Sequence, residues 1–338
     1  MSAPRPHVVV TRGLPEGWLA PLEAACTLTV GPPEPGGVGP ELRRALARAD
    51  GLFCLLTERI DRAVLDAAPG LRVVSTMAVG VDNIDVAACT ARGIPVGNTP
   101  GVLTDATADL TMALLLACAR RLPEAAADAR AGRWTTWSPT GWLGIDLRGR
   151  VLGVIGLGAI GQAVARRARA FGMSIVYAGP SRRAEAEAAL DARRLPLAEL
   201  LAASDVVTLH APRSPSTERM IDADALARMR PGAILINTAR GSIVDPDALF
   251  DALQRRTIAA AAIDVTDPEP LPAGHRLFGL ENLLVTPHVG SATADTRRRM
   301  AAIACDNLLA GLEGRRLPAC VNPEVYDRGV AEDRSGGT

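Results

Sequence analysis

A glycine-rich segment directly after an apolar run constrains the fold of this chain more than any other feature. The run Val151–Ile155 is typical of a buried strand, and an amphipathic helical pattern follows over Gln162–Phe171. The segment between them has the spacing GxGxxG and consists of Gly156, Leu157, Gly158, Ala159, Ile160 and Gly161. A strand, this glycine spacing and a helix in that order predict a βαβ unit that binds a dinucleotide.

Each glycine of this motif has a separate physical role. Gly156 permits the tight turn after the strand, Gly158 lets the backbone approach a pyrophosphate, and Gly161 allows close packing of the helix on the strand. The phosphates then lie at the helix N-terminus, where backbone N–H groups carry a partial positive charge. The alternative is a glycine-rich turn that holds no ligand.

The residues after the next strand bear on the choice of cofactor. That strand is Ser174–Ala178, and Gly179 follows where an enzyme that prefers NAD places a carboxylate for the ribose hydroxyls. No acid there repels a 2′-phosphate, and Ser181, Arg182 and Arg183 follow as hydrogen-bond donors and counter-charges. We therefore expect NADP(H) as the favoured cofactor, with NAD(H) as the alternative. Equally, Arg182 and Arg183 could simply begin a solvated surface helix.

The length and the pattern of apolar runs indicate two α/β domains. The chain has 338 residues, and a single domain usually holds about 100 to 200. Strand-like runs alternate with helical patterns, as parallel βαβ construction requires. These runs cover residues 8–10, 51–56, 71–77, 151–155, 174–178, 205–208, 233–237, 259–264 and 283–286.

Two helical patterns suggest where the domains divide. Thr104 is a candidate N-cap residue for an apolar helix over Ala106–Arg120, and the pattern over Ala292–Gly311 can return the chain to the first domain. We therefore expect a discontinuous first domain of residues 1–104 and 290–326 and a second domain of residues 105–289. Residues 327–338, rich in glycine and charge, are expected to form a flexible tail.

Charge and cysteine content exclude several classes of function. Lys plus Arg equals Asp plus Glu at 37 each, so net charge draws the chain toward neither nucleic acid nor an acidic membrane surface. The six cysteines form no CxxC pair, which argues against a structural zinc site and a secreted disulfide framework. Because no run of about 18 apolar residues is present, we expect a cytoplasmic protein whose partners are small molecules.

Three further segments follow strands of the second domain and carry polar side chains. In an open parallel sheet, ligands bind at the carboxyl ends of the strands. An arginine, a glutamate and a histidine gathered there suit a carboxylate-bearing substrate that exchanges a proton. These residues are Arg240 in segment 236–241, Glu269 in segment 263–270 and His288 in segment 286–293.

Together with the glycine motif, these segments resemble the signature blocks of the D-isomer specific 2-hydroxyacid dehydrogenases. The resemblance runs from about residue 71 to residue 323, and it is closest to the glyoxylate/hydroxypyruvate reductases of that family. The closer likeness is carried by Gly80–Asn83, Thr99–Asp105, Arg121–Glu124, Trp134–Trp137 and Leu271–Pro272.

The resemblance implies a fold and an activity for the whole chain. The expected fold has two Rossmann-like domains with an interdomain cleft: a flavodoxin-like substrate domain and a doubly wound cofactor domain. The expected reaction is the NAD(P)H-dependent reduction of a small 2-oxo acid, glyoxylate or hydroxypyruvate, to the D-2-hydroxy acid. The pair of domains is expected to assemble as a homodimer.

The resemblance also assigns roles to individual residues. It implies that His288 is the acid/base, that Glu269 is its partner and that Arg240 clamps the substrate carboxylate. Histidine titrates near neutral pH and can donate a proton to a carbonyl oxygen, and the planar guanidinium of arginine matches a carboxylate. The alternatives are an interdomain ion pair of Arg240 with Glu269 and a turn histidine at position 288.

Further residues of this resemblance contact substrate or cofactor. The backbone N–H groups of Val79 and Gly80 are implied to bind the substrate carboxylate, and Asp264 is implied to lie near the nicotinamide amide. Leu55, Thr57 and Trp137 are candidates for lining the substrate pocket. Trp134 and Trp137 either shape substrate choice or serve as packing anchors, and both readings stay open. His7, His210 and His275 are assigned no proton transfer.

Two kinds of rival function stay open. Within the family, the substrate could be 2-ketogluconate, 3-phosphoglycerate, phosphite or formate. Formate is disfavoured because its dehydrogenases pair the histidine with glutamine, whereas Glu269 is an acid. From a different class, the fold also serves nicotinamide-sensing corepressors, which bind cofactor and respond to it. Repeated turnover of a 2-oxo acid separates the enzyme from the sensor.

Overall fold

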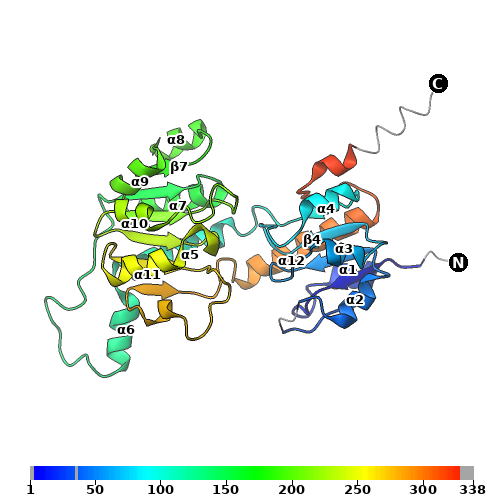
Figure 1. Cartoon of the computed structure of the whole chain (residues 1–338), viewed down its shortest axis with the longest axis horizontal. Helices are drawn as coiled ribbons and strands as arrows, with labels where there is room; N and C mark the ends of the chain where they lie inside the picture. The colour runs from blue at the N-terminus through cyan, green and yellow to red at the C-terminus, as the bar shows by residue number, and fades with distance from the viewer. Residues whose placement is uncertain (1–3, 35–36, 328–338) are drawn as a thin grey trace. The chain divides into compact units, whose positions relative to one another are not determined.

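The computed structural model describes residues 4–34 and 37–327 and divides into two compact units. The first unit comprises Met1–Leu103 and Thr293–Thr338, and the second comprises Thr104–Ala292. Nearly all of the expected tail, residues 328–338, lies outside the described residues. Each unit is built on its own parallel sheet (Figure 1).

The first unit is a five-stranded parallel sheet with helices on both faces. Its strand order is β2-β1-β3-β4-β5, which is the 2-1-3-4-5 order of flavodoxin-like folds. The strands are β1 (His7–Val10), β2 (Thr27–Val30), β3 (Gly51–Cys54), β4 (Val73–Thr76) and β5 (Val96–Gly97). The helices are α1 (Ala20–Ala25), α2 (Pro40–Leu46), α3 (Arg62–Asp66), α4 (Val86–Ala91), α12 (Ala294–Leu312) and the short η3 (Pro323–Tyr326).

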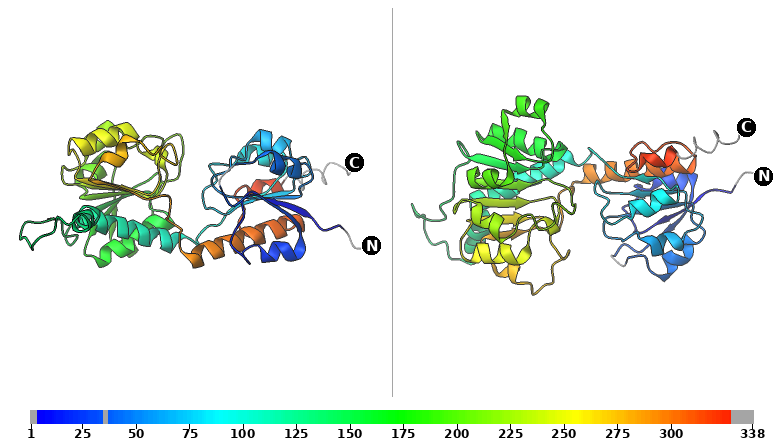
Figure 2. Two further views of the ribbon diagram at one scale, coloured as in Figure 1. Left: turned by 90° about the horizontal axis from the view of Figure 1, so that it is seen from below. Right: turned by 45° about the horizontal axis from the view of Figure 1, so that its top comes forward.

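Alternate residues of β1 contribute to the two apolar layers of this unit. Val8 and Val10 pack with α1 and α12, whereas Val9 packs with α2, α3 and α4. A strand covered on both faces needs apolar residues at every position, and Val8–Val10 supplies them. Helix α12, orange in Figure 2, runs along one face of the sheet and so ties the returning chain into the first unit.

The second unit is a seven-stranded parallel sheet with the order β12-β11-β10-β9-β6-β7-β8. Counted along the chain, this is the doubly wound 3-2-1-4-5-6 order extended by one further strand. Its strands are β6 (Val151–Ile155), β7 (Ser174–Ala178), β8 (Ala192–Arg194), β9 (Val206–Leu209), β10 (Ile234–Asn237), β11 (Ala260–Ile263) and β12 (Leu283–Val285). The order reverses between β6 and β9, so a ligand crevice is expected outside their carboxyl ends.

Helices cover both faces of this second sheet. One apolar layer is formed with α5, α7 and α8, and the other with α9, α10 and α11 (Figure 2). The helices are α5 (Thr104–Ala119), α6 (Leu122–Arg130), α7 (Ala159–Ala170), α8 (Ala184–Leu190), α9 (Leu197–Ala203), α10 (Ala223–Arg228) and α11 (Pro246–Gln254), with the 3₁₀ turns η1 (Gly241–Ile243) and η2 (Arg276–Gly279). The α/β class predicted from the sequence is thus confirmed.

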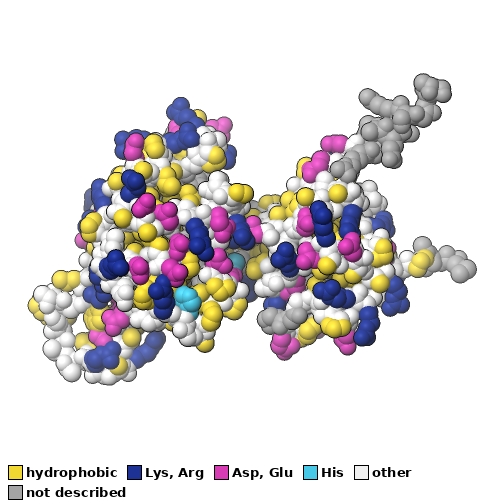
Figure 3. Space-filling model, viewed as in Figure 1, with side chains coloured by type: hydrophobic (Ala, Val, Ile, Leu, Met, Phe, Trp, Pro, Cys, Tyr) yellow, Lys and Arg dark blue, Asp and Glu magenta, His cyan; other side chains and the backbone are white. Residues whose placement is uncertain are grey.

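The sequence prediction was incomplete at the sheet edges and at one helix start. Strands β2, β5 and β8 were not predicted, because they are two to four residues long and lack a continuous apolar run. Thr104 is the first residue of α5 and not its N-cap residue. Charged side chains of both signs are interspersed over the face that Figure 3 shows. Within residues 4–34 and 37–327, no helix is long and apolar enough to cross a membrane.

Candidate active site

The glycine motif occupies the turn between β6 and α7. Gly156 has φ +94°, and a Cβ there would lie 2.7 Å from the backbone N of Ala211. A Cβ at Gly161 would lie 2.3 Å from the carbonyl oxygen of Gly156. Glycine is therefore required at both positions by contacts within the fold itself.

The same turn leaves room for a ligand at the start of α7. A Cβ added at Gly158 would meet no heavy atom of the described chain within 4 Å. Gly158 is also the N-cap residue of α7, and no side chain caps the helix there. An open helix N-terminus beside a glycine fits the pyrophosphate of a dinucleotide.

A cavity of about 760 Å³ adjoins this turn at the carboxyl ends of β6, β7 and β9. Its lining includes Ile155, Gly156, Gly179, Arg194, Pro212 and Thr217. The cavity lies at the point where the strand order reverses, which is where doubly wound sheets bind nucleotides. Its volume falls in the range of about 300 to 1,000 Å³ typical of small-molecule sites.

The basic residues after β7 are engaged in a local network. Arg182 Nε donates to Glu187 Oε2 at 2.8 Å, and the hydroxyl of Tyr177 donates to Glu187 Oε1 at 2.6 Å. The backbone N–H of Arg183 donates to the Tyr177 hydroxyl oxygen at 3.0 Å. The hydrogen bonds from Tyr177 and Arg182 hold the pKa of Glu187 below its usual value. Ser181 and both arginines are exposed just before α8, in line with the surface-helix alternative.

His288 and Glu269 form a hydrogen-bonded pair at the carboxyl ends of β11 and β12. His288 Nδ1 lies 2.6 Å from Glu269 Oε1, and the backbone N–H of Thr266 donates to Glu269 Oε2 at 3.2 Å. Burial raises the pKa of Glu269, but the hydrogen bond and charge of His288, the Thr266 N–H and the charge of Arg240 together bring it below its usual value. The carboxylate is therefore ionised at neutral pH.

Asp264 holds the loop that carries His288. Its Oδ1 accepts from the Thr286 hydroxyl at 2.6 Å and from the Val289 N–H at 2.8 Å, and its Oδ2 accepts from the Gly290 N–H at 2.8 Å. Its carbonyl oxygen accepts from the His288 N–H at 2.9 Å. These bonds hold His288 at φ +53°, a conformation that is uncommon for a residue with a Cβ.

Arg240 lies in a turn after β10 that packs on the loop leading to Glu269. The Asn237 side chain fixes this turn by donating to the Arg240 carbonyl at 2.8 Å and accepting from the Ala239 N–H at 3.0 Å. A Cβ at Gly241 would lie 2.0 Å from the Thr266 carbonyl carbon, so only glycine allows this close packing. The second unit thus brings Arg240, Glu269 and His288 to one end of its sheet.

Four of the remaining predicted substrate residues, Leu55, Thr57, Val79 and Gly80, belong to the first unit. Val79 and Gly80 follow β4, and Asn98 Nδ2 donates to the Val79 carbonyl at 2.8 Å. Leu55 and Thr57 lie in a loop after β3, which Asn83 Nδ2 holds through the carbonyl oxygens of Leu55 and Glu58.

Glu58, which was not identified from the sequence, anchors this loop from inside the first unit. It is 2% exposed, and its carboxylate accepts from Thr11, Arg12, Thr57 and the Leu55 N–H. In the sequence, Glu58 is only a single glutamate close to an apolar run, and nothing there predicts that it is buried. Its burial became apparent only in the fold.

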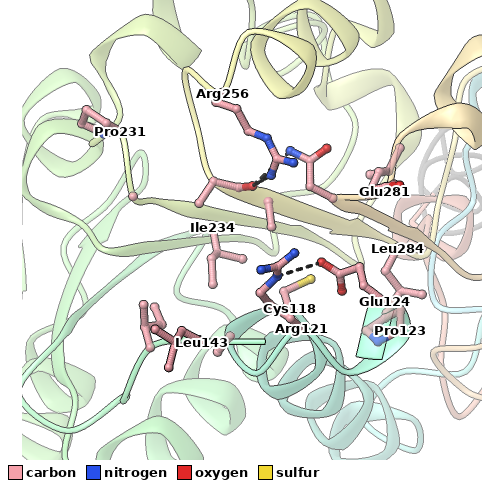
Figure 4. A pocket seen from close by; sticks show the side chains of 18 residues that line it. Cys118, Arg121, Pro123, Glu124, Leu143, Pro231, Ile234, Arg256, Glu281 and Leu284 are labelled. Atoms are coloured by element: carbon pink, nitrogen blue, oxygen red, sulfur yellow. Dashed lines mark hydrogen bonds and ion pairs between the residues drawn. The ribbon is translucent and has the colours of Figure 1, made fainter. Parts of the chain in front are cut away.

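The two tryptophans do not line the cavity beside the glycine motif, and a second cavity opens elsewhere in the second unit. Trp134 and Trp137 are 73% and 79% exposed and lie between α6 and β6. A cavity of about 460 Å³ opens at the amino ends of β10, β11 and β12, opposite to the end that carries His288. On its wall Arg121 pairs with Glu124, as Figure 4 shows. No predicted site residue lines this cavity.

His210, the histidine after β9, is unsuited to proton transfer. Its Nε2 lies 2.9 Å from the Thr208 hydroxyl, and burial lowers its pKa to about 3. It is therefore neutral at neutral pH.

Comparison with known proteins places this geometry in a family. Residues 112–290 match the model of the D-isomer specific 2-hydroxyacid dehydrogenase NAD-binding domain. A glyoxylate reductase of Korarchaeum cryptofilum is 46% identical over 322 residues, which is 95% of this chain and 97% of the relative.

Two solved structures are similar over most of their length. A Thermus thermophilus protein is 49% identical with a TM-score of 0.87, covering 93% of this chain and 99% of that one. An NADPH-dependent glyoxylate/hydroxypyruvate reductase from Sinorhizobium meliloti, in complex with NADP and malonate, is 35% identical with a TM-score of 0.81, covering 94% and 97%. The chain therefore belongs to the D-isomer specific 2-hydroxyacid dehydrogenases, and its second unit contains the family's nicotinamide cofactor domain.

Proposed function

We propose that this protein reduces glyoxylate and hydroxypyruvate to their 2-hydroxy acids. The observation that carries the proposal is the His288–Glu269 pair beside the Arg240 turn, at the ligand-binding end of a nicotinamide domain. Support also comes from the glyoxylate reductases among its relatives, which match almost the whole chain. The reaction needs a proton donor, a carboxylate clamp and a hydride, and a bound nicotinamide supplies the hydride.

In this proposal the side chains of the second unit handle the proton and the substrate charge. Glu269 accepts from Nδ1 of His288, which fixes the ring orientation. Nε2 of the protonated ring then donates to the substrate carbonyl oxygen, which becomes the 2-hydroxyl group. The Arg240 guanidinium holds the substrate carboxylate and polarises the carbonyl, and the N–H groups of Val79 and Gly80 are further carboxylate ligands.

Asp264 supports this chemistry in either of two ways. The sequence resemblance assigns it to the nicotinamide amide, and this assignment stays a prediction. Its carboxylate meanwhile accepts three hydrogen bonds from the loop of His288. We propose that fixing this loop is part of its role, because the loop conformation sets where the imidazole lies.

NADP(H) is proposed as the favoured cofactor and NAD(H) as the alternative. The turn after β7 carries Gly179 where a carboxylate would disfavour a 2′-phosphate, and Ser181, Arg182 and Arg183 follow within the same turn. The similar reductase of S. meliloti is described as NADPH-dependent. Arg182 is a poorer ligand for the 2′-phosphate than its position suggests, because its charge is already balanced by Glu187.

We also propose that the first unit is the substrate domain and that the protein is a homodimer. The exposed arm, residues 122–146, carries large apolar side chains on the surface: Leu122, Trp134, Trp137 and Leu143 are 53%, 73%, 79% and 64% exposed. Helix α6 within it has no buried residue. Exposed apolar surface of this kind marks association sites, and a second copy of the chain is the proposed occupant.

The activity is tested by following nicotinamide absorbance with NADPH and NADH in parallel. Glyoxylate, hydroxypyruvate, pyruvate and 2-ketogluconate serve as substrates. The proposal expects fast oxidation of NADPH with glyoxylate or hydroxypyruvate. A clear preference for 2-ketogluconate would move the assignment within the family. Cofactor binding without turnover of any acid would support the nicotinamide-sensing alternative.

A further inference from the structure

An arginine on the edge strand of the second unit reaches the turn that follows β7. Arg194 is the last residue of β8, and it lies opposite Tyr177 in the parallel register of β7 and β8. Its Nη2 donates to the carbonyl oxygens of Gly179 and Pro180 at 2.8 and 3.2 Å. The guanidinium therefore lies against the turn in which Gly179 stands where NAD-preferring enzymes carry a carboxylate.

The cavity beside the glycine motif shows what surrounds this guanidinium. Among the described residues that line the cavity of about 760 Å³, Arg194 is the one with a charged side chain. The rest of the lining is glycine, apolar residues, and the hydroxyl residues Ser214, Ser216 and Thr217. The wall thus combines one cation with hydroxyl donors and no carboxylate, which suits a phosphate group.

Arg194 differs from Arg182 in what its guanidinium hydrogen-bonds, although the charge of Arg194 also helps to lower the pKa of Glu187. Arg182 donates to the Glu187 carboxylate, so a phosphate there would compete with an existing ion pair. The hydrogen bonds from Arg194 to Gly179 and Pro180 are to neutral carbonyl oxygens, and both use Nη2. A guanidinium has five donor hydrogens, and those of Nε and Nη1 can meet two phosphate oxygens.

We propose that Arg194 is a specificity residue of this enzyme and binds the 2′-phosphate of NADP(H). The inference deepens the proposed function and rests on it, because it assumes that the nucleotide occupies the cavity at the glycine motif. The carbonyl oxygens of Gly179 and Pro180 hold the guanidinium at the ribose end of that cavity. The phosphate is recognised by an arginine from the third strand of the unit, in addition to the residues that directly follow β7.

Binding of nucleotide fragments tests this without relying on turnover. Isothermal titration calorimetry on the intact protein compares adenosine 2′,5′-bisphosphate with adenosine 5′-monophosphate, which differ only in the 2′-phosphate. The variants are Arg194→Gln, the charge-preserving Arg194→Lys, and Arg182→Gln, which tests Arg182 as the alternative ligand of the 2′-phosphate. Arg193→Gln is the matched control, because Arg193 is exposed, precedes Arg194 on the same strand and points to the other face.

Arg194→Gln is expected to weaken the bisphosphate roughly 10- to 100-fold, since it removes a charge-assisted hydrogen bond. Binding of the monophosphate is expected to be unchanged, which also shows that the variant is folded. Arg194→Lys should retain part of the preference, and Arg193→Gln should retain all of it. Added salt should reduce the preference of the wild-type protein more than that of Arg194→Gln.

Other outcomes overturn the inference in distinguishable ways. If Arg194→Gln keeps the preference for the bisphosphate, or Arg182→Gln alone removes it, Arg194 does not bind the 2′-phosphate. An equal loss in Arg193→Gln would show a general charge effect and would also overturn it. If the wild-type protein binds both nucleotides equally, the NADP(H) preference fails while the enzyme class stands. If it binds neither nucleotide, the cofactor site of the proposed function fails as well.

Discussion

Replacement of Asp264 by asparagine is expected to destabilise the loop that carries His288. The Asp264 side chain is 1% exposed, and both of its oxygens accept hydrogen bonds from donors in the loop. Asparagine keeps one acceptor oxygen but presents an NH₂ group to at least one of these donors, so a buried N–H loses its partner. An unsatisfied buried donor costs about 1 to 3 kcal/mol, more where a charged acceptor is lost. We expect Asp264→Asn to lower the free energy of unfolding by about 2 to 4 kcal/mol.

Urea denaturation followed by circular dichroism measures this loss, with Asp251→Asn as the control. Asp251 is exposed on α11, so its variant should stay within about 0.5 kcal/mol of the wild-type protein. The reduction rate of Asp264→Asn should fall as well, because the position of His288 depends on the same loop. An Asp264→Asn protein as stable as the control would refute the view that these hydrogen bonds hold the loop.

Three further predictions follow from the site and the exposed arm. The pKa of Glu269 is lower in the folded protein than in the unfolded chain, where it is about 4.3. The ionised carboxylate therefore stabilises the fold above that pH, and this stabilisation is lost as the pH falls through the folded-state pKa. The stability difference between wild type and Glu269→Gln should therefore shrink across that acid window in denaturation midpoints measured against pH. Gly156→Ala should cost about 2 kcal/mol or more and abolish calorimetric nucleotide binding, because its Cβ meets the Ala211 backbone. The double variant Trp134→Ser and Trp137→Ser should shift the mass in light scattering from dimer to monomer; an unchanged dimer would contradict the role of the arm.

The sequence predicted those parts of the fold whose physical cause is local. The β6–glycine–α7 unit follows from spacing: Gly161 packs against Gly156 five residues earlier, and Gly156 has a positive φ and packs against the backbone just after β9. Strands β1, β6 and β9 were predicted because they are covered on both faces and so are apolar at almost every position. In contrast, β8 is an edge strand with the sequence Ala-Arg-Arg, which looks like a surface helix or loop.

Site residues could be predicted only where a chemically suitable side chain follows the end of a predicted strand. Arg240, Glu269 and His288 follow strands and resemble family blocks, so they were named, although their roles stay predictions. Arg194 was missed because β8 was missed, and without that strand nothing brings it to Gly179.

The network around Glu187 was missed for a related reason. Glu187 lies on α8 and contacts Arg182 and Tyr177, which precede it by five and ten residues, across the turn after β7. Side-chain contacts across a turn leave no periodic signal in a single sequence. The charge of Arg182 therefore looked free when it was already paired.

The most direct test of the proposed chemistry is the rate of glyoxylate reduction with saturating NADPH in wild-type protein and in His288→Ala. Nucleotide binding by calorimetry is measured on the same samples, so that loss of the proton donor is separated from loss of the cofactor. With binding retained, we predict a rate lower by about 10²- to 10⁴-fold, the usual contribution of a general acid. A His288→Ala protein that reduces glyoxylate within about threefold of the wild-type rate, far short of that contribution, would contradict the assignment of His288 as the proton donor.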